Sequence, residues 1–273
     1  MNLMKRMFQG LAAIALTAAP PAVATAAQCG NDAAGFEAWV HQFKGEAAAS
    51  GISRSTLDLA FANVGYNRAT IRADRGQKSF KLTLDQFMQK RGGQTIINRG
   101  RSLRKQHASI LARIESQYGV PAGPLVAIWG METGFGGFMG KEHTLSAVAT
   151  LAYDCRRSPY FTEQLYAALN LLESGTLSPD AIGAAHGEIG QTQFLPVNVL
   201  RYGVDGDGDG RIDLVRSKAD ALASTANFLR GHGWSAGGGY QPGEINFAAI
   251  QGWNAASVYQ QAIAIIGAAI DGD

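Results

Sequence analysis

Glu132 is the carboxylate whose position in the sequence most strongly suggests chemistry. It follows the apolar run 125–129 and precedes several glycines, so we expect it in the last turn of a buried helix that Gly134 ends. The C-terminus of a helix carries partial negative charge, and burial beside Trp129 and Phe135 also disfavours an ionised carboxylate. Both effects raise the pKa of Glu132, as a general acid working near neutral pH requires.

Amphipathic helices are the elements expected to position this acid. Phe36, Trp39, Val40 and Phe43 recur at helical spacing, and the segment from Phe161 to Leu172 repeats that pattern. Sustained β alternation is scarce, and glycine clusters at 134–140, 203–210 and 231–243 indicate irregular loops. The sequence therefore predicts a mainly α fold. Further helices are predicted at 54–61, 80–88, 102–117, 145–152, 218–230 and 255–269.

The start of the chain has the layout of a secretory signal peptide. Lys5 and Arg6 precede an apolar stretch at 11–19 and then small residues, so residues 1–27 are predicted to be removed. Their loss leaves 22 basic and 22 acidic side chains, a balance that gives no electrostatic case for nucleic-acid binding. No later run reaches the ~20 apolar residues of a membrane span. We expect an exported, periplasmic and soluble protein.

Cys29 and Cys155 are the only two cysteines of the chain. Export to an oxidising compartment favours a disulfide between them, and two thiols are too few for a closed metal site. On the chain-entropy model the bond would be worth roughly 4–5 kcal/mol. The alternative is two buried free thiols. A lipid-modified cysteine would follow a small residue, whereas Gln28 precedes Cys29, so no lipid anchor is expected.

The sequence resembles a known enzyme family over nearly the whole mature chain. The run Glu-Thr-Gly-Phe-Gly at 132–136 is similar to the catalytic signature of the B-type lytic murein transglycosylases. The resemblance continues in order through 149–157, 187–196, 222–229, 231–234 and 253–254. It implies an α+β, lysozyme-like fold, with a helical N-terminal subdomain at 28–118 on a catalytic core at 119–273.

The resemblance also implies a reaction. Members of this family cleave the MurNAc–GlcNAc bond of peptidoglycan glycan strands and leave a 1,6-anhydro-muramyl end, without a catalytic cofactor. Glu132 would protonate the glycosidic oxygen and then accept the proton of the muramyl 6-hydroxyl. The N-acetyl group of the sugar would assist, which makes a second carboxylate unnecessary.

Several residues match positions of the family's substrate cleft. Gln193 and Phe194 would fix an N-acetyl sugar and pack on its ring, and Arg156 with Arg157 would bind carboxylates of the stem peptide. The remaining predicted substrate contacts are Trp253, Asn254, Tyr259 and Tyr153. Any of these aromatic rings could instead belong to the core, and paired arginines are commonly solvated.

The chain departs from the family at one place in the cleft. Ala184 and Ala185 stand where family members often have Ser-Trp. A serine hydroxyl that orients the acetamido group of the sugar would be missing.

An aspartate-glycine loop at 205–220 resembles an EF-hand calcium site. Its acids occupy positions 1, 3, 5 and 9, with glycine at position 6, but Arg216 replaces the glutamate expected at position 12. The predicted ligands of a structural calcium ion are Asp205, Asp207, Asp209, Arg211 and Asp220. The simpler alternative is that Ser217 and Asp220 cap the following helix.

Two other functions remain open from the sequence. Glu188, in the segment HGEIGQTQF, could act with Glu132 across a water-sized gap in a hydrolytic muramidase, which would give reducing ends instead of anhydro ends. The departure at Ala184 is also compatible with a non-catalytic, calcium-stabilised glycan-binding protein. The intact motif around Glu132 favours an enzyme.

Overall fold

The computed structural model describes residues 27–76 and 82–272. The predicted signal peptide lies outside these residues except for Ala27. Within the described part of the chain the structure is mainly α-helical, as predicted, and no helix there has the length and apolar character needed to cross a membrane. The helices are α1 (Phe36–Ala49), α2 (Arg54–Phe61), α3 (Arg68–Arg75), α4 (Leu84–Arg91), α5 (Gly93–Gln106), α6 (Ala108–Tyr118), α7 (Ala122–Thr133), α8 (Thr144–Tyr153), α9 (Ser158–Glu173), α10 (Pro196–Tyr202), α11 (Lys218–Gly231), α12 (Phe247–Trp253) and α13 (Ser257–Asp271).

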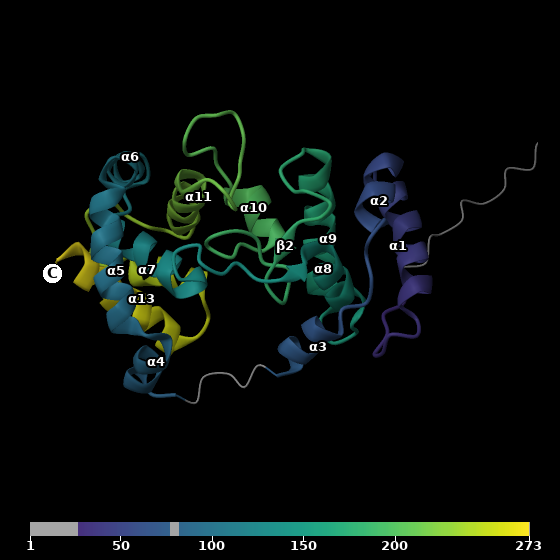
Figure 1. Ribbon diagram of the computed structural model, residues 1–273, viewed down its shortest axis with the longest axis horizontal. Helices are drawn as coiled ribbons and strands as arrows, with labels where there is room; N and C mark the ends of the chain where they lie inside the picture. Colours follow the sequence, from purple (N-terminus) through teal and green to yellow (C-terminus); the bar gives the residue numbers. More distant parts are fainter. Residues whose placement is uncertain (1–26, 77–81, 273) are drawn as a thin grey trace, which may run out of the picture.

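Helix α7 is the buried centre of one end of the molecule. It packs along α13 and against α5, and these elements gather at the same side of Figure 1. The closest approach between α7 and α13 needs glycine, since a Cβ atom on Gly123 would lie 2.4 Å from the carbonyl oxygen of Gly267. Every residue of α7 except Glu132 is buried, as expected for a helix whose sequence is apolar on all sides.

Helices α8 and α9 form the centre of the other end, and α1, α2 and α3 pack against them (Figure 1). The predicted disulfide is confirmed here: Cys29 and Cys155 are bonded, with their Cα atoms 4.9 Å apart. It ties the segment before α1 to the turn after α8, and the backbone of Gly30 pairs with that of Asp154 beside it.

The segment 28–118 contributes helices to both ends of the molecule. Helices α1 to α3 pack on α8 and α9, whereas α4 to α6 pack on α13, α7 and α11. The domain boundary at 118 stays a prediction.

Regular β structure is limited in the described residues to two short antiparallel strands, β1 (Glu142–His143) and β2 (Ile182–Gly183). Glu142 pairs with Gly183, and His143 pairs with Ile182. This pair brings the chain after the glycine loop next to the segment that carries Glu188.

Most of the predicted helices are present, with one clear error. The helix predicted at 102–117 is divided at His107 into α5 and α6, and α5 begins nine residues earlier than expected, at Gly93. The His107 ring packs on Trp129, with ring centroids 6.0 Å apart, so a tertiary contact accompanies the break. Helices α3, α10 and α12 were not predicted, because each is short and lacks a full apolar stripe.

Candidate active site

The end of α7 places Glu132 as the sequence predicted. Gly134 terminates the helix in the left-handed conformation, with φ of 59°, and its N–H donates to the carbonyl oxygen of Gly130. Its neighbours Met131 and Thr133 are buried, but Glu132 keeps part of its surface accessible. An acid that is embedded in the protein yet reachable from outside fits a proton donor.

Two hydrogen bonds fix the Glu132 carboxyl group, and both end on the same oxygen. The indole Nε1–H of Trp253 donates to Oε1 at 2.9 Å, and the hydroxyl of Tyr259 donates to Oε1 at 2.7 Å. In the acid form, Oε1 is therefore the carbonyl oxygen and the proton lies on Oε2. Trp253 ends α12 and Tyr259 lies in the first turn of α13, so both donors come from the C-terminal part of the chain.

The balance of local effects raises the pKa of Glu132. Burial raises it most strongly, and the negative charge of Glu188 acts in the same direction. The hydrogen bonds from Trp253 and Tyr259 and the positive charge of Arg91 lower the pKa without offsetting the burial. Burial also raises the pKa of Tyr259 well above its ordinary value, and the Glu132 carboxylate adds to this, so Tyr259 stays a neutral donor.

Gln191 joins α7 to the loop that follows β2, a role that sequence reasoning missed. Its Oε1 accepts a hydrogen bond from Nε1–H of Trp129 at 3.1 Å, and its backbone carbonyl accepts one from the Thr133 hydroxyl at 2.6 Å. Its Nε2 donates to the carbonyl oxygen of Val215 in the aspartate-glycine loop. A buried glutamine between glycine and threonine gave no periodic signal of this role.

Two non-glycine residues adopt the left-handed backbone conformation beside the site. Phe135 has φ of 65° and Gln193 has φ of 59°. Such conformations cost on the order of 1–3 kcal/mol and concentrate at functional positions. The side-chain amide of Gln193 donates to the carbonyl oxygens of Gly190 and Met139, so it links its own turn to the glycine loop.

Three of the aromatic rings that were predicted to contact sugar are buried in the structure. Phe194 is 2% exposed and packs edge-to-face on Phe228 and Trp253, and Tyr259 is 4% exposed and holds Glu132. Tyr153 is 3% exposed in an aromatic cluster with the rings of α1, at the other end of the molecule. The family matches assigned these rings to the substrate cleft, but a sequence match does not tell a ring that faces the cleft from one that faces the core.

The remaining predicted contacts have structural partners. Arg156 and Arg157 both form ion pairs with the buried Asp74 of α3. The guanidinium nitrogen of Arg157 lies 2.9 Å from Oδ1 of Asp74. The side chain of Asn254 accepts a hydrogen bond from the backbone N–H of Ala256, ahead of α13. Trp253 is the only one of the predicted aromatic contacts that stays partly exposed while touching Glu132.

Glu188 has an environment that differs from that of Glu132. Its carboxylate accepts the backbone N–H of His186 at 2.9 Å and contacts Nδ1 of the same residue at 3.1 Å. Burial acts to raise the pKa of Glu188, but the hydrogen bonds and charge of His186 outweigh it, so the pKa is lowered. The pKa values of Glu188 and Glu132 are thus shifted in opposite directions.

Comparison with known proteins assigns the sequence to a family. Residues 35–245 match the family model for the transglycosylase SLT domain. Over 134 residues the chain is 38% identical to the membrane-bound lytic murein transglycosylase B of Escherichia coli K12. The chain belongs to the B-type lytic murein transglycosylases. That match covers 48% of this chain and only 37% of the Escherichia coli protein.

Solved structures of other lytic transglycosylases share the fold. SltB3 of Pseudomonas aeruginosa, in complex with NAG-anhNAM-pentapeptide, is 32% identical with a TM-score of 0.81, covering 87% of this chain and 80% of that one. Slt35 of Escherichia coli, in complex with calcium, is 24% identical with a TM-score of 0.76, covering 90% of this chain and 96% of that one. The predicted lysozyme-like fold is confirmed.

The aspartate-glycine loop of this family member brings three carboxylates together. Asp205, Asp207 and Asp209 are exposed, and each offers an oxygen within 4.8 Å of the others. Both oxygens of Asp205 accept backbone N–H groups of the loop, which lower its pKa and keep it ionised. Three carboxylate oxygens at this spacing suit a hard cation such as calcium.

Asp220 lies against the same loop but outside this cluster of three carboxylates, and its role as a ligand stays a prediction. It is buried, and its two oxygens accept backbone N–H groups of Gly206, Asp207 and Asp213. The Ser217 hydroxyl also donates to it, and Asp220 N–H donates back to Ser217 at the start of α11. The contacts with Ser217 agree with the capping alternative.

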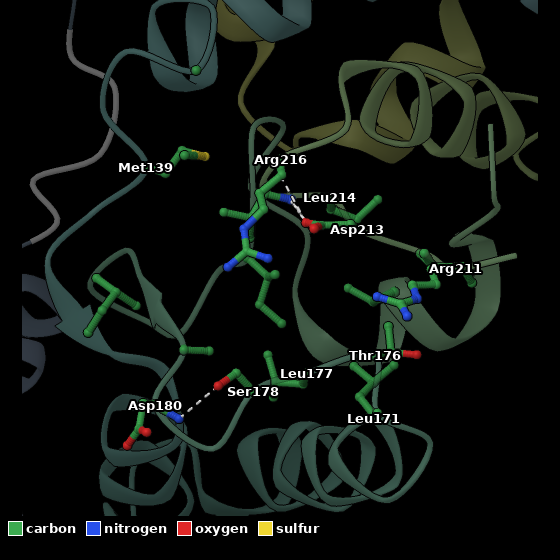
Figure 2. A pocket seen from close by; sticks show the side chains of 18 of the residues that line it. Met139, Leu171, Thr176, Leu177, Ser178, Asp180, Arg211, Asp213, Leu214 and Arg216 are labelled. Atoms are coloured by element: carbon green, nitrogen blue, oxygen red, sulfur yellow. Dashed lines mark hydrogen bonds between the residues drawn. The ribbon is translucent and has the colours of Figure 1, made fainter. Parts of the chain in front are cut away.

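A hollow of about 1080 Å³ lies between the glycine loop, the end of α9 and the aspartate-glycine loop. Figure 2 shows Arg211 and Arg216 on one side and Leu171, Thr176 and Leu177 on the other. Gly136 and Gly137 line the hollow four and five residues after Glu132, whereas Glu132 itself does not. The hollow is thus a neighbour of the acid and not its immediate surroundings.

Proposed function

We propose that this chain is an exported lytic transglycosylase that cleaves the MurNAc–GlcNAc β-1,4 bond of peptidoglycan glycan strands and leaves a 1,6-anhydro-muramyl end. The observation that carries the proposal is the accessible Glu132, whose Oε1 accepts both Trp253 and Tyr259 and whose pKa is raised. Support also comes from SltB3, which has been solved with an anhydro-muramyl ligand.

The first step is protonation of the leaving group. Oε2 of Glu132 donates its proton to the glycosidic oxygen, the bond from C1 of MurNAc to that oxygen breaks, and its electron pair stays on the oxygen. Positive charge then develops at C1, and the N-acetyl group of the sugar shares it. The two donors on Oε1 stabilise the carboxylate that Glu132 becomes, so they favour the transition state over the ground state.

The second step returns the proton to Glu132. The 6-hydroxyl oxygen of the same MurNAc attacks C1, and its proton passes to the Glu132 carboxylate. The products are a 1,6-anhydro-muramyl end and a GlcNAc end with a free 4-hydroxyl, and no water is consumed. One carboxyl group serves as acid and then as base, provided that water is kept from C1.

Digestion of isolated sacculi tests this function. The wild-type protein is expected to release muropeptides with anhydro ends, detected by mass spectrometry, and Glu132→Gln is expected to release at least 10³-fold less, because it has no proton to donate or accept. Glu163→Gln is the matched control, since Glu163 is an exposed acid of α9 that pairs with Arg201. Full activity of Glu132→Gln, or reducing ends from the wild type, would contradict the proposal.

We also propose a structural calcium ion in the aspartate-glycine loop. Asp205, Asp207 and Asp209 would hold it, with the backbone carbonyl of Arg211 as the expected further ligand. A bound cation would order the loop and, through the bond from Gln191 to Val215, the segment beside the site. Calorimetry with calcium should show binding to the wild type and none to Asp205→Asn with Asp209→Asn; no heat from either would leave only an acidic turn.

Periplasmic location belongs to the same proposal. The disulfide between Cys29 and Cys155 suits an oxidising compartment, and the sequence before it has the layout of a signal peptide.

A further inference from the structure

Glu188 has a fixed position that the proposed reaction does not use. Its Oε2 accepts the backbone N–H of His186, and its Oε1 contacts Nδ1 of His186, so both oxygens are oriented by one residue. The side chain keeps 23% of its surface exposed. Glu188 is thus a carboxylate whose two oxygens are oriented by His186 and whose exposed face remains available for an interaction outside its own loop.

Asp74 continues this arrangement on the far side of the imidazole. Its Oδ1 lies 3.7 Å from Nε2 of His186, and the Asp74 side chain is 1% exposed. Arg156 and Arg157, from the turn after α8, both pair with it. His186 therefore lies between two carboxylates, and the buried one is anchored to two other elements of the fold.

The same loop is bonded to the helix that carries Glu132. Gln191, three residues after Glu188, accepts hydrogen bonds from Trp129 and Thr133 of α7. The backbone carbonyl of Glu188 accepts the N–H of Ala184 near β2. These bonds keep the segment that carries Glu188 in register with the end of α7.

We propose that Glu188 is an electrostatic positioning residue for Glu132: a carboxylate, fixed by His186 and Asp74, whose negative charge acts on Glu132 and on the positive charge formed at C1 of the sugar. This inference rests on the proposed function. It differs from a hydrolytic role, because Glu188 acts through its charge and neither attacks the sugar nor activates water.

The charges around the two acids agree with this assignment. Glu188 raises the pKa of Glu132, whereas Arg91 of α4 and the donors Trp253 and Tyr259 lower it. Contacts with His186 lower the pKa of Glu188. The negative charge of Glu188 in turn acts to raise the pKa of Glu132 and of Tyr160. Arg157 lies over the Tyr160 ring and, with Arg156, pairs with Asp74.

The contacts of Glu188 also argue against a role as the base of a hydrolase. Both oxygens have a His186 partner, and the pKa of Glu188 is lowered. A carboxylate with a lowered pKa is a weak base, so it removes a proton from water poorly. Its negative charge, in contrast, is fully present over the working pH range.

The test is the pH dependence of kcat/KM on a soluble glycan-strand substrate for wild type, Glu188→Gln and the control Glu163→Gln. Activity requires protonated Glu132 and is lost as pH rises through its pKa. Removal of the neighbouring negative charge lowers that pKa, so the basic limb should move to lower pH by on the order of half a unit. The maximal kcat should fall about tenfold, while Glu163→Gln should match the wild type.

Other outcomes would overturn the inference. A basic limb of Glu188→Gln that coincides with that of the wild type excludes electrostatic coupling, and complete loss of activity in a folded variant indicates a residue that reacts directly. If Glu188→Gln does not fold, His186→Gln gives the second test, because it removes the imidazole that contacts Oε1 of Glu188 and so changes how this carboxylate is held; its basic limb must also shift, and an unshifted limb contradicts the inference. Wild-type protein that forms no anhydro ends would instead refute the proposed function, whatever the pH profiles.

Discussion

Glu132 and Glu188 are two partly buried glutamates whose pKa values are shifted in opposite directions. Burial acts to raise the pKa of each. Glu132 has the neutral donors Trp253 and Tyr259, which do not offset that burial, whereas Glu188 has His186, which does. The partner of a buried carboxyl group, more than the depth of its burial, therefore decides whether its pKa is raised or lowered.

After Glu132→Gln, the next largest loss of activity is expected from Glu132→Asp. The shorter side chain keeps the acid but withdraws it from Trp253 and Tyr259, and a displacement near 1 Å at a reacting group can cost on the order of 10²-fold. Turnover of glycan strands, measured with circular dichroism to verify the fold, is expected to fall by about that factor. Unchanged turnover would show that the position of the acid is not critical.

A smaller effect of distinctive sign is expected from Tyr259→Phe. The hydroxyl stabilises the Glu132 carboxylate, so its removal raises the pKa of Glu132 and moves the basic limb of the kcat/KM profile to higher pH, opposite to Glu188→Gln. The kcat should fall roughly tenfold, since the ionised form is stabilised less. Tyr160→Phe, which removes an exposed hydroxyl from α9, is the matched control. A shift to lower pH would contradict the account.

The smallest effect is expected on stability. The lowered pKa of Glu188 contributes stability that is present above the pKa of an unfolded glutamate and is lost as pH falls through the folded value. Wild-type protein should therefore melt a few degrees above Glu188→Gln near neutral pH, and the gap should close in acid below about pH 4. Calorimetric melting temperatures at several pH values provide the check. A gap that widens in acid would reverse the assignment.

The sequence allowed prediction of the elements whose signals are local. The apolar run before Glu132 and the glycine after it are enough to specify a buried helix and its end, and α7 has that form. Two cysteines in a chain that is predicted to be exported leave one pairing, and it is present.

What could not be predicted depends on residues far apart in the chain. Tyr259 is 127 residues from Glu132, and its hydroxyl has the same sequence context whether it faces a sugar or an acid. The short helix α3 lacks a full apolar stripe, so the buried Asp74 that holds Arg156 and Arg157 gave no signal. Asp220 was ambiguous because calcium loops and helix caps use the same residue types.

The comparison of the two glutamates is tested most directly by a titration of their side chains. Carboxyl ¹³C NMR of protein labelled at glutamate, with Glu132→Gln and Glu188→Gln to assign the signals, measures both ionisations in one sample. Glu132 is expected to titrate above the ordinary glutamate value of about 4.3, and Glu188 is expected to titrate below it. A Glu132 signal that titrates at or below that value would contradict the claim that the fold keeps this acid protonated.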